Sequence, residues 1–217
     1  NIPEIHEIEG DTALYMEDDP ATIIDMVPTS AFVQDFDSPD FDGGLVEIQI
    51  VTGLQPDEDV LGINSEGNYG GEIGISGDYV TYGGVPFGEI TEDPANGLIT
   101  VDMNIGGPAN ADAVTALLQN ITYSNINSDA PTEGDRTVQV TLWDGDGGVV
   151  GDAGEHQMTV TVEGVNDTPV ITNIAGMNVN YEEGDPPKAL DPDSNGAVSD
   201  VDSMDFDGGM LVVEITN

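Results

Sequence analysis

The stretch Thr137-Val138-Gln139-Val140-Thr141-Leu142-Trp143 alternates polar and apolar residues. Successive side chains of a β-strand point to opposite faces, so the apolar residues of this stretch would all lie on one face. Gln157–Val165 has the same alternation, and the Gly-rich loop Asp144–Gly154 separates the two. We therefore expect an antiparallel hairpin with one face in a core.

Short apolar and β-branched runs with turn residues between them recur along the rest of the chain. They predict strands at Glu4–Ile8, Ala21–Asp25, Leu45–Val51, Gly71–Ile75, Asp78–Tyr82, Phe87–Thr91, Leu98–Asn104 and Ile121–Ser124. Many short strands at this spacing indicate an all-β fold and a β-sandwich of the immunoglobulin type. We place extra Gly-rich hairpins in Gln55–Gly97, because a plain immunoglobulin-type domain has only about 100 residues.

One segment has helical rather than strand periodicity. Val114, Leu117 and Leu118 form an apolar stripe at three- and four-residue spacing within Ala111–Asn120, and Asn110 can cap the start of a helix there. We expect one short helix that covers an open edge or end of the sandwich.

The chain contains an internal repeat. Asp35-Phe36-Asp37-Ser38 returns as Asp200-Val201-Asp202-Ser203, and Tyr15-Met16-Glu17 returns as Tyr181-Glu182-Glu183. A repeat of this length defines the folding unit of a tandem array. We expect one complete repeat over residues 1–167 and the first strands of a second, incomplete repeat over residues 168–217.

The composition is strongly acidic, with 43 Asp and Glu residues, two Lys and Arg residues, and a formal net charge of −41. Such a charge would repel nucleic acid and anionic membrane surfaces. No apolar stretch approaches the roughly 18 residues that a membrane-spanning helix needs. The chain has no cysteine, so its stability would come from its core, from bound metal, or from both.

Several of the acids form closely spaced pairs near turn residues. These are Asp35 with Asp37, Asp144 with Asp146, Asn166 with Asp167, and Asp200 with Asp202. Ca²⁺ binds six to eight oxygens, and such pairs supply them at short spacing. For any single Asp the alternative is a solvated turn residue, and a high-salt environment would also offset the charge.

Immunoglobulin-like strand order would sort these loops to the two ends of the domain. The loops with Asp35 and Asp144 would lie at the end nearest the chain start. The Tyr15-x-Glu17 turn, the Thr132–Asp135 turn and the exit linker Asn166-Asp167 would lie at the opposite end. The Asp200 loop of the next repeat would follow directly, so that acids from both repeats converge.

The layout resembles the cadherin-like repeats of large bacterial and archaeal surface proteins and adhesins. The phrases that carry the resemblance are the two Tyr-x-Glu turns, the two Asp-x-Asp-Ser loops, Leu117–Asn125, Gly134–Val138 and Val165-Asn166-Asp167-Thr168-Pro169. The resemblance covers the first repeat except Gln55–Gly97, and the part of the second repeat that is present.

The resemblance implies calcium between consecutive repeats, held by an early Glu, an Asn-Asp linker and a following Asp-x-Asp. The matching residues are Glu17, Asn166, Asp167, Asp200 and Asp202, with Glu183 as the equivalent of Glu17. The sequence departs from the vertebrate signature at Glu133-Gly134-Asp135, where Glu133 and Asp135 are further candidates. With Asp35, Asp37, Asp144 and Asp146 they complete the expected set of calcium ligands.

The sequence shows no recognisable arrangement of catalytic residues. His6 and His156 are isolated, and chance pairs are certain among so many carboxylates, so we expect no enzyme. We expect an extracellular or cell-surface adhesion module that forms calcium-rigidified rods or fibres. Its partners would be neighbouring repeats, other copies joined by strand addition, and a surface or glycan ligand. The alternative is a carbohydrate-binding or accessory domain of a secreted enzyme. A groove lined by exposed aromatic residues would favour it, but only 6 % of the residues are aromatic.

Overall fold

The computed structural model describes residues 3–25, 30–36, 40–145, 154–174, 176 and 178–216. It divides into two compact units, Asn1–Gly164 and Val165–Asn217, called the first and second units below. The regular elements of the described residues are β-strands except for the helix α1 (Ala111–Leu118) and the 3₁₀ turn η1 (Pro94–Asn96). The fold is therefore all-β, as the sequence predicts.

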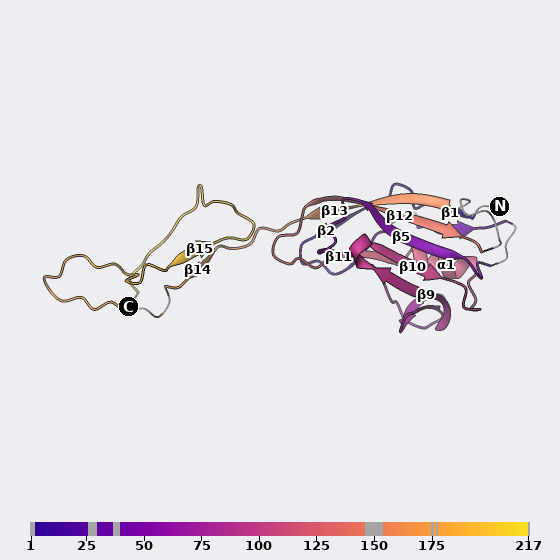
Figure 1. Ribbon diagram of the computed structural model, residues 1–217, viewed down its shortest axis with the longest axis horizontal. Coiled ribbons are helices and arrows are strands. Elements are labelled where there is room, and N and C mark those ends of the chain that lie inside the picture. Colours follow the sequence, from indigo (N-terminus) through magenta and orange to yellow (C-terminus); the bar gives the residue numbers. More distant parts are fainter. Residues whose placement is uncertain are drawn as a thin grey trace. The chain divides into compact units, whose positions relative to one another are not determined.

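The larger sheet of the first unit has eight strands. In spatial order they are β2 (Thr12–Met16), β13 (Gly154–Glu163), β12 (Gly134–Trp143), β5 (Leu45–Thr52), β10 (Leu98–Asp102), β9 (Val85–Asp93), β8 (Tyr79–Tyr82) and β7 (Ile73–Ser76). Strands β13, β12, β5, β10 and β9 run side by side in Figure 1. The hairpin of β12 and β13 is confirmed, with Gln139 opposite Gln157. Strand β2 lies parallel to β13, whereas the other neighbours are antiparallel.

Two smaller sheets complete the first unit. One consists of β3 (Thr22–Ile23), β11 (Ile121–Asn125) and β6 (Asp59–Ile63), and the other pairs β1 (Glu4–His6) with β4 (Phe32–Gln34). Leu61 and Tyr123 of the three-stranded sheet belong to the same buried cluster as Ile48 and Val140 of the larger sheet. The sheets therefore share one hydrophobic core.

The helix α1 covers an edge of the two-stranded sheet of β1 and β4, in agreement with the expectation from its apolar stripe. The Asn110 side chain caps it by accepting a hydrogen bond from Ala113 N at 2.9 Å. Thr115 Oγ1 accepts a bond from Val33 N at 2.9 Å, and Gln119 Nε2 donates to Ala31 O at 2.7 Å. The helix thus occupies the side of β4 that β1 leaves open.

The Gly-rich hairpins expected in Gln55–Gly97 are present as β7, β8 and β9, which extend the larger sheet. Gly77 has a φ of 62° at the turn between β7 and β8, a conformation that favours glycine. Ile73, Val80 and Phe87 are fully buried in the shared core. The same stretch also supplies β6 to the three-stranded sheet, which the sequence pattern did not predict.

All ten predicted strands overlap observed ones, but β2, β4 and β6 were missed. Strand β2 carries apolar residues on both faces, because Leu14 is 49 % exposed while Tyr15 is buried. Strand β4 has only three residues, and β6 begins with a buried Asp59. In the second unit β14 (Val170–Thr172) pairs with β15 (Ala197–Ser199), and neither was predicted.

Asp25 links the end of β3 to β4 and provides a test of pH dependence. Its Oδ1 accepts a hydrogen bond from Ala31 N at 2.9 Å. Burial, opposed by this bond and reinforced by the nearby Asp11, raises the pKa of Asp25. A raised pKa means that the folded protein binds this proton more tightly than the unfolded chain does. The contribution of the protonated Asp25 carboxyl to the free energy of unfolding is therefore complete below the ordinary Asp pKa of about 3.9. It is lost as the pH rises through the raised pKa of the folded protein.

We therefore expect the substitution Asp25→Asn to stabilise the protein at pH 7, because it keeps the bond from Ala31 and removes the buried charge. The gain should be about 1.4 kcal/mol for each unit by which the pKa is raised. Urea unfolding of both proteins at pH 7 and at acidic pH checks this, with the difference expected to shrink toward low pH. An equal difference at both pH values would contradict it.

Candidate functional site

The Tyr15-x-Glu17 turn lies where β2 ends beside β13. Glu17 N donates to Glu163 O at 2.9 Å, and Asp18 then turns the chain with a φ of 65°. The Tyr15 hydroxyl donates to Asp19 O at 3.0 Å and lies 3.2 Å from Asn125 O. These bonds hold Glu17, which is only 7 % exposed, at one end of the larger sheet.

Glu133 and Glu17 approach the same point on the backbone. Gly164 N donates to Glu133 Oε1 at 3.2 Å. A Cβ atom added to Gly164 would lie 3.2 Å from Glu133 Oε1 and 3.7 Å from Glu17 Oε2. Two carboxylates therefore flank Gly164, the last residue of the first unit. This arrangement offers hard oxygen ligands and repels anions.

A buried network that the sequence did not reveal supports the turn carrying Glu133. Arg136 donates through Nη2 to Thr132 O at 2.6 Å and through Nη1 to Gly134 O at 2.9 Å. Its Nε lies 3.1 Å from Asp59 Oδ2, and both residues are almost completely buried. Arg136 thereby fixes the carbonyls on both sides of Glu133. The one available signal was that Arg136 is the only basic residue before Lys188.

Glu58 holds the same turn from the other side. Its carboxylate accepts hydrogen bonds from Thr132 N at 2.8 Å and from Thr132 Oγ1 at 3.0 Å. Burial alone would raise the pKa of Glu58, but the bonds from Thr132, Asn127 and Asn125 outweigh it and lower the pKa. Burial and the bond to Asp59 raise the pKa of Tyr123, which keeps its hydroxyl protonated within the network.

Asp135 has a different environment from Glu133. It lies in β12 opposite Thr161 of β13, and its Oδ1 accepts a hydrogen bond from Thr161 Oγ1 at 2.8 Å. This bond occupies one carboxylate oxygen on the exposed face of the strand pair. The structure therefore groups Glu133, rather than Asp135, with Glu17.

The acids expected near the chain start lie on several loops. Asp35 follows β4 and Asp144 follows β12, and both are partly buried. The two glycines before β5 pack against the loop after β12, since a Cβ on Gly44 would meet Trp143 O at 2.3 Å. Asp37 and Asp146 lie outside the described residues.

In the second unit the structure brings Asp167, Asp200 and Asp202 together. Asp167 N donates to Asp202 Oδ2 at 2.6 Å, and Ser203 N donates to Asp200 Oδ1 at 3.0 Å. The hydrogen bond with the Asp200 side chain, and then the bond from Asp167 N, lower the pKa of Asp202. The Asn166 side chain donates to Asp167 O. Glu183 lies apart from these residues in sequence, in the exposed turn after Tyr181.

The repeated phrases have the same local structure in both units. Asp19 N donates to Met16 O at 2.9 Å, and Asp185 N donates to Glu182 O at 3.0 Å. Tyr181 OH donates to Asp185 O at 2.8 Å, as Tyr15 OH does to Asp19 O. Likewise Gly44 N bonds Phe41 O and Gly209 N bonds Phe206 O, both at 2.9 Å. The sequence repeat is therefore also a repeat of turn structure.

Among the residues that the structure describes, no three acids or histidines are arranged to hold a metal ion. The convergent sets are smaller, namely Glu17 with Glu133 in the first unit and Asp200 with Asp202 in the second. Ca²⁺ takes six to eight oxygens, so either set would need water, carbonyl oxygens or further carboxylates to complete its shell.

Comparison with known proteins adds no assignment: the chain matches no protein-family model, no curated protein and no solved structure. In the described part of the chain, no helix combines the length and the apolar character that crossing a membrane requires; α1 has eight residues.

Proposed function

We propose that the chain is a structural, non-enzymatic adhesion module of a secreted or cell-surface repeat protein, with Ca²⁺ bound at its acidic turns. The shared turn structure of Tyr15–Asp19 and Tyr181–Asp185 supports a tandem array. The strong net charge of −41 supports a role for a divalent cation, because closely spaced carboxylates repel one another.

The sheet order supports a cadherin-like, immunoglobulin-type sandwich as the architecture of the repeat. Strands β13, β12 and β5 are adjacent, as strands G, F and C are in that fold, and β3, β11 and β6 correspond to B, E and D. The parallel β2 adds a first strand beside the last. Under this proposal β7, β8 and β9 are the extra hairpins of this particular repeat.

The convergence of Glu17 and Glu133 on Gly164 is the observation that carries the calcium proposal. Asp167, Asp200 and Asp202 form a corresponding group in the second unit. Neighbouring carboxylates repel one another when both are charged, and their oxygens are the ligands that Ca²⁺ prefers. Asp35 and Asp144, with the undescribed Asp37 and Asp146, are proposed as ligands on the other loops.

Calcium should therefore stabilise the protein. At fixed ionic strength and with free Ca²⁺ about 100 times the Kd, we expect the free energy of unfolding to rise by about 2.7 kcal/mol relative to chelator. For extracellular modules the Kd is about 10⁻⁴–10⁻³ M. Thermal unfolding and isothermal titration calorimetry measure the two quantities.

Matched variants locate the ion. Glu17→Gln and Asp202→Asn should each weaken calcium binding, whereas Asp57→Asn, an exposed acid with no proposed role, should leave it unchanged. Equal melting midpoints in calcium and in chelator would remove the basis for the proposal. A loss in Glu17→Gln but not in Asp202→Asn would confine the ion to the first unit.

In an array of such repeats, calcium would neutralise neighbouring carboxylates and stiffen the protein into a rod or fibre. The proposed partners are neighbouring repeats, further copies joined by strand addition, and a surface or glycan ligand. Small-angle X-ray scattering with calcium and with chelator would detect the stiffening as a larger radius of gyration. An unchanged radius would argue against a calcium-rigidified rod.

A further inference from the structure

Strand β6 is one of the two outer strands of the three-stranded sheet, and one of its sides bonds β11. The bonds from Asn64 N to Asn120 O and from Ile126 N to Glu58 O, both 2.8 Å, flank this pairing. They show which residues of β6 direct their backbone groups toward β11. Residues alternate in an antiparallel ladder, so Leu61 and Ile63 direct their N–H and C=O groups to the other side. Among the described strands, none pairs with that side.

A groove of about 480 Å³ runs along this side of β6. Ile75, at the end of β7, and Ile90, in β9, contribute the opposite wall. A smaller hollow of about 50 Å³ shares Val60, Leu61 and Glu92 with the groove and continues it toward η1. The combined volume lies in the range of ligand clefts, about 300–1,000 Å³.

The groove carries two carboxylates and receives no basic side chain from the chain itself. Asp78 and Glu92 line it beside the isoleucines. The chain has only two Lys and Arg residues, of which Arg136 is buried against Asp59 and Lys188 pairs with Asp185 at 2.5 Å in the second unit. The charge complement of this groove must therefore come from outside the chain.

We propose that the groove binds an extended peptide segment of another protein, which adds a strand to β6 and presents alternating apolar and basic side chains. The peptide backbone would bond the outward N–H and C=O groups of Leu61 and Ile63, as in other cases of β-strand addition. Its apolar side chains would contact Ile75 and Ile90. A Lys or Arg two residues along would face Asp78 and Glu92.

Charge favours a basic partner over a second copy of this chain. Each copy carries a formal net charge of −41, so an acidic strand from another copy would meet Asp78 and Glu92 with repulsion. Like charges placed together cost several kcal/mol at an interface. This site is independent of calcium, because none of the proposed calcium ligands lines it.

The test uses the full chain and a short synthetic peptide in which one face is threonine and the other alternates valine and lysine. Hydrogen exchange measured by NMR reports each backbone amide. At a peptide concentration about ten times the Kd, exchange of the Leu61 and Ile63 amides should slow about tenfold by mass action. Peptide bound only by general charge attraction would leave these two amides unchanged and would overturn the proposal.

Matched peptides and variants separate strand addition from charge. A peptide N-methylated at the amides that face β6 keeps the lysines but should lose the protection, and a glutamate-for-lysine peptide should not bind. Asp78→Asn combined with Glu92→Gln should weaken binding about tenfold, whereas Glu89→Gln, on the opposite face of β9, should have no effect. Equal binding by all of these peptides and variants would overturn the proposal.

If a second copy of this chain occupied the groove, hydrogen exchange would show a different result. The Leu61 and Ile63 amides would then become protected as protein concentration rises with no peptide present. That result would also overturn the proposal. Since the measurement can be made in chelator, failure here would leave the calcium proposal intact.

Discussion

Replacing Arg136 with methionine should lower the free energy of unfolding of the first unit by about 3–5 kcal/mol. Arg136 is 1 % exposed, and its Nε lies 3.2 Å and 3.1 Å from the two oxygens of Asp59, which is 2 % exposed. Methionine fills similar space but leaves a buried carboxylate without its counter-charge. The guanidinium bonds to Thr132 O and Gly134 O are lost as well. Urea unfolding followed by Trp143, the single tryptophan, reports on this unit.

A double-mutant cycle isolates the pair. Asp59→Asn together with Arg136→Met should cost less than the sum of the two single substitutions, because the double variant has no buried charge left over. Lys188→Met removes the other Lys or Arg side chain, which forms a solvent-screened surface pair in the second unit and should have far less effect on stability. A loss at Arg136 no larger than that at Lys188 would contradict the buried network.

The same substitution links stability to the proposed calcium site. Arg136 holds the carbonyls on both sides of Glu133, so Arg136→Met should loosen the turn that brings Glu133 toward Glu17. We expect weaker calcium binding under conditions where the variant is still folded. Unchanged affinity would mean that Glu133 does not depend on this support.

Phe87→Ala should lower the free energy of unfolding by about 3–5 kcal/mol, as other buried Phe→Ala substitutions do. Phe87 lies in β9 and is fully buried in the same core as Val46 and Val140. The cavity would open in the core beneath β9, and β9 has little freedom to move into it because it is bonded to both β8 and β10. Unfolding followed by Trp143 fluorescence is again the measurement.

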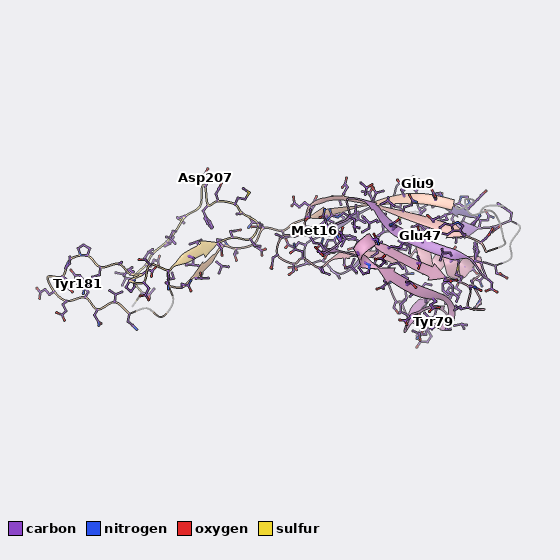
Figure 2. All side chains as sticks on the ribbon, viewed as in Figure 1. Glu9, Met16, Glu47, Tyr79, Tyr181 and Asp207 are labelled. Atoms are coloured by element: carbon purple, nitrogen blue, oxygen red, sulfur yellow. The ribbon has the colours of Figure 1, made fainter. Side chains whose placement is uncertain are left out.

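Tyr79 provides the matched control. It is an aromatic residue of the neighbouring β8, but 40 % of it is exposed, and Figure 2 shows it at the outer surface of the first unit. Tyr79→Ala should therefore cost clearly less than Phe87→Ala. Similar small effects for both would mean that the β7–β9 hairpins are an appendage rather than part of the core.

Most of the strands could be predicted, because each leaves a local pattern. Val138, Val140 and Leu142 alternate with polar residues, and in β12 all three are fully buried. The helix α1 was equally visible, since Asn110 and the apolar stripe lie within one short segment. Strand β6 was missed because its buried Asp59 looks polar in sequence and is compensated by Arg136, 77 residues further on.

The acidic site was only partly accessible from sequence. The spacing of Asp200 and Asp202 correctly indicated two neighbouring carboxylates, and the structure adds the bond from Asp167 N. Nothing in the sequence separated Glu133, which turns toward Gly164, from Asp135, which bonds Thr161. Glu133 lies in the turn just before β12, whereas Asp135 lies within β12 opposite Thr161, and the point at which the strand begins was not visible in the sequence.

By itself, the sequence determined the all-β class, the helix α1 and the repeated turns, because these depend on side-chain alternation, capping and turn residues only a few positions apart. The tertiary structure alone decided that β2 lies parallel to β13, that Arg136 meets Asp59, and that Glu17 and Glu133 share Gly164. These pairings join residues far apart in the chain. Which distant segments become neighbours depends on how the sheets pack around a common core, and short-range sequence patterns do not predict that packing.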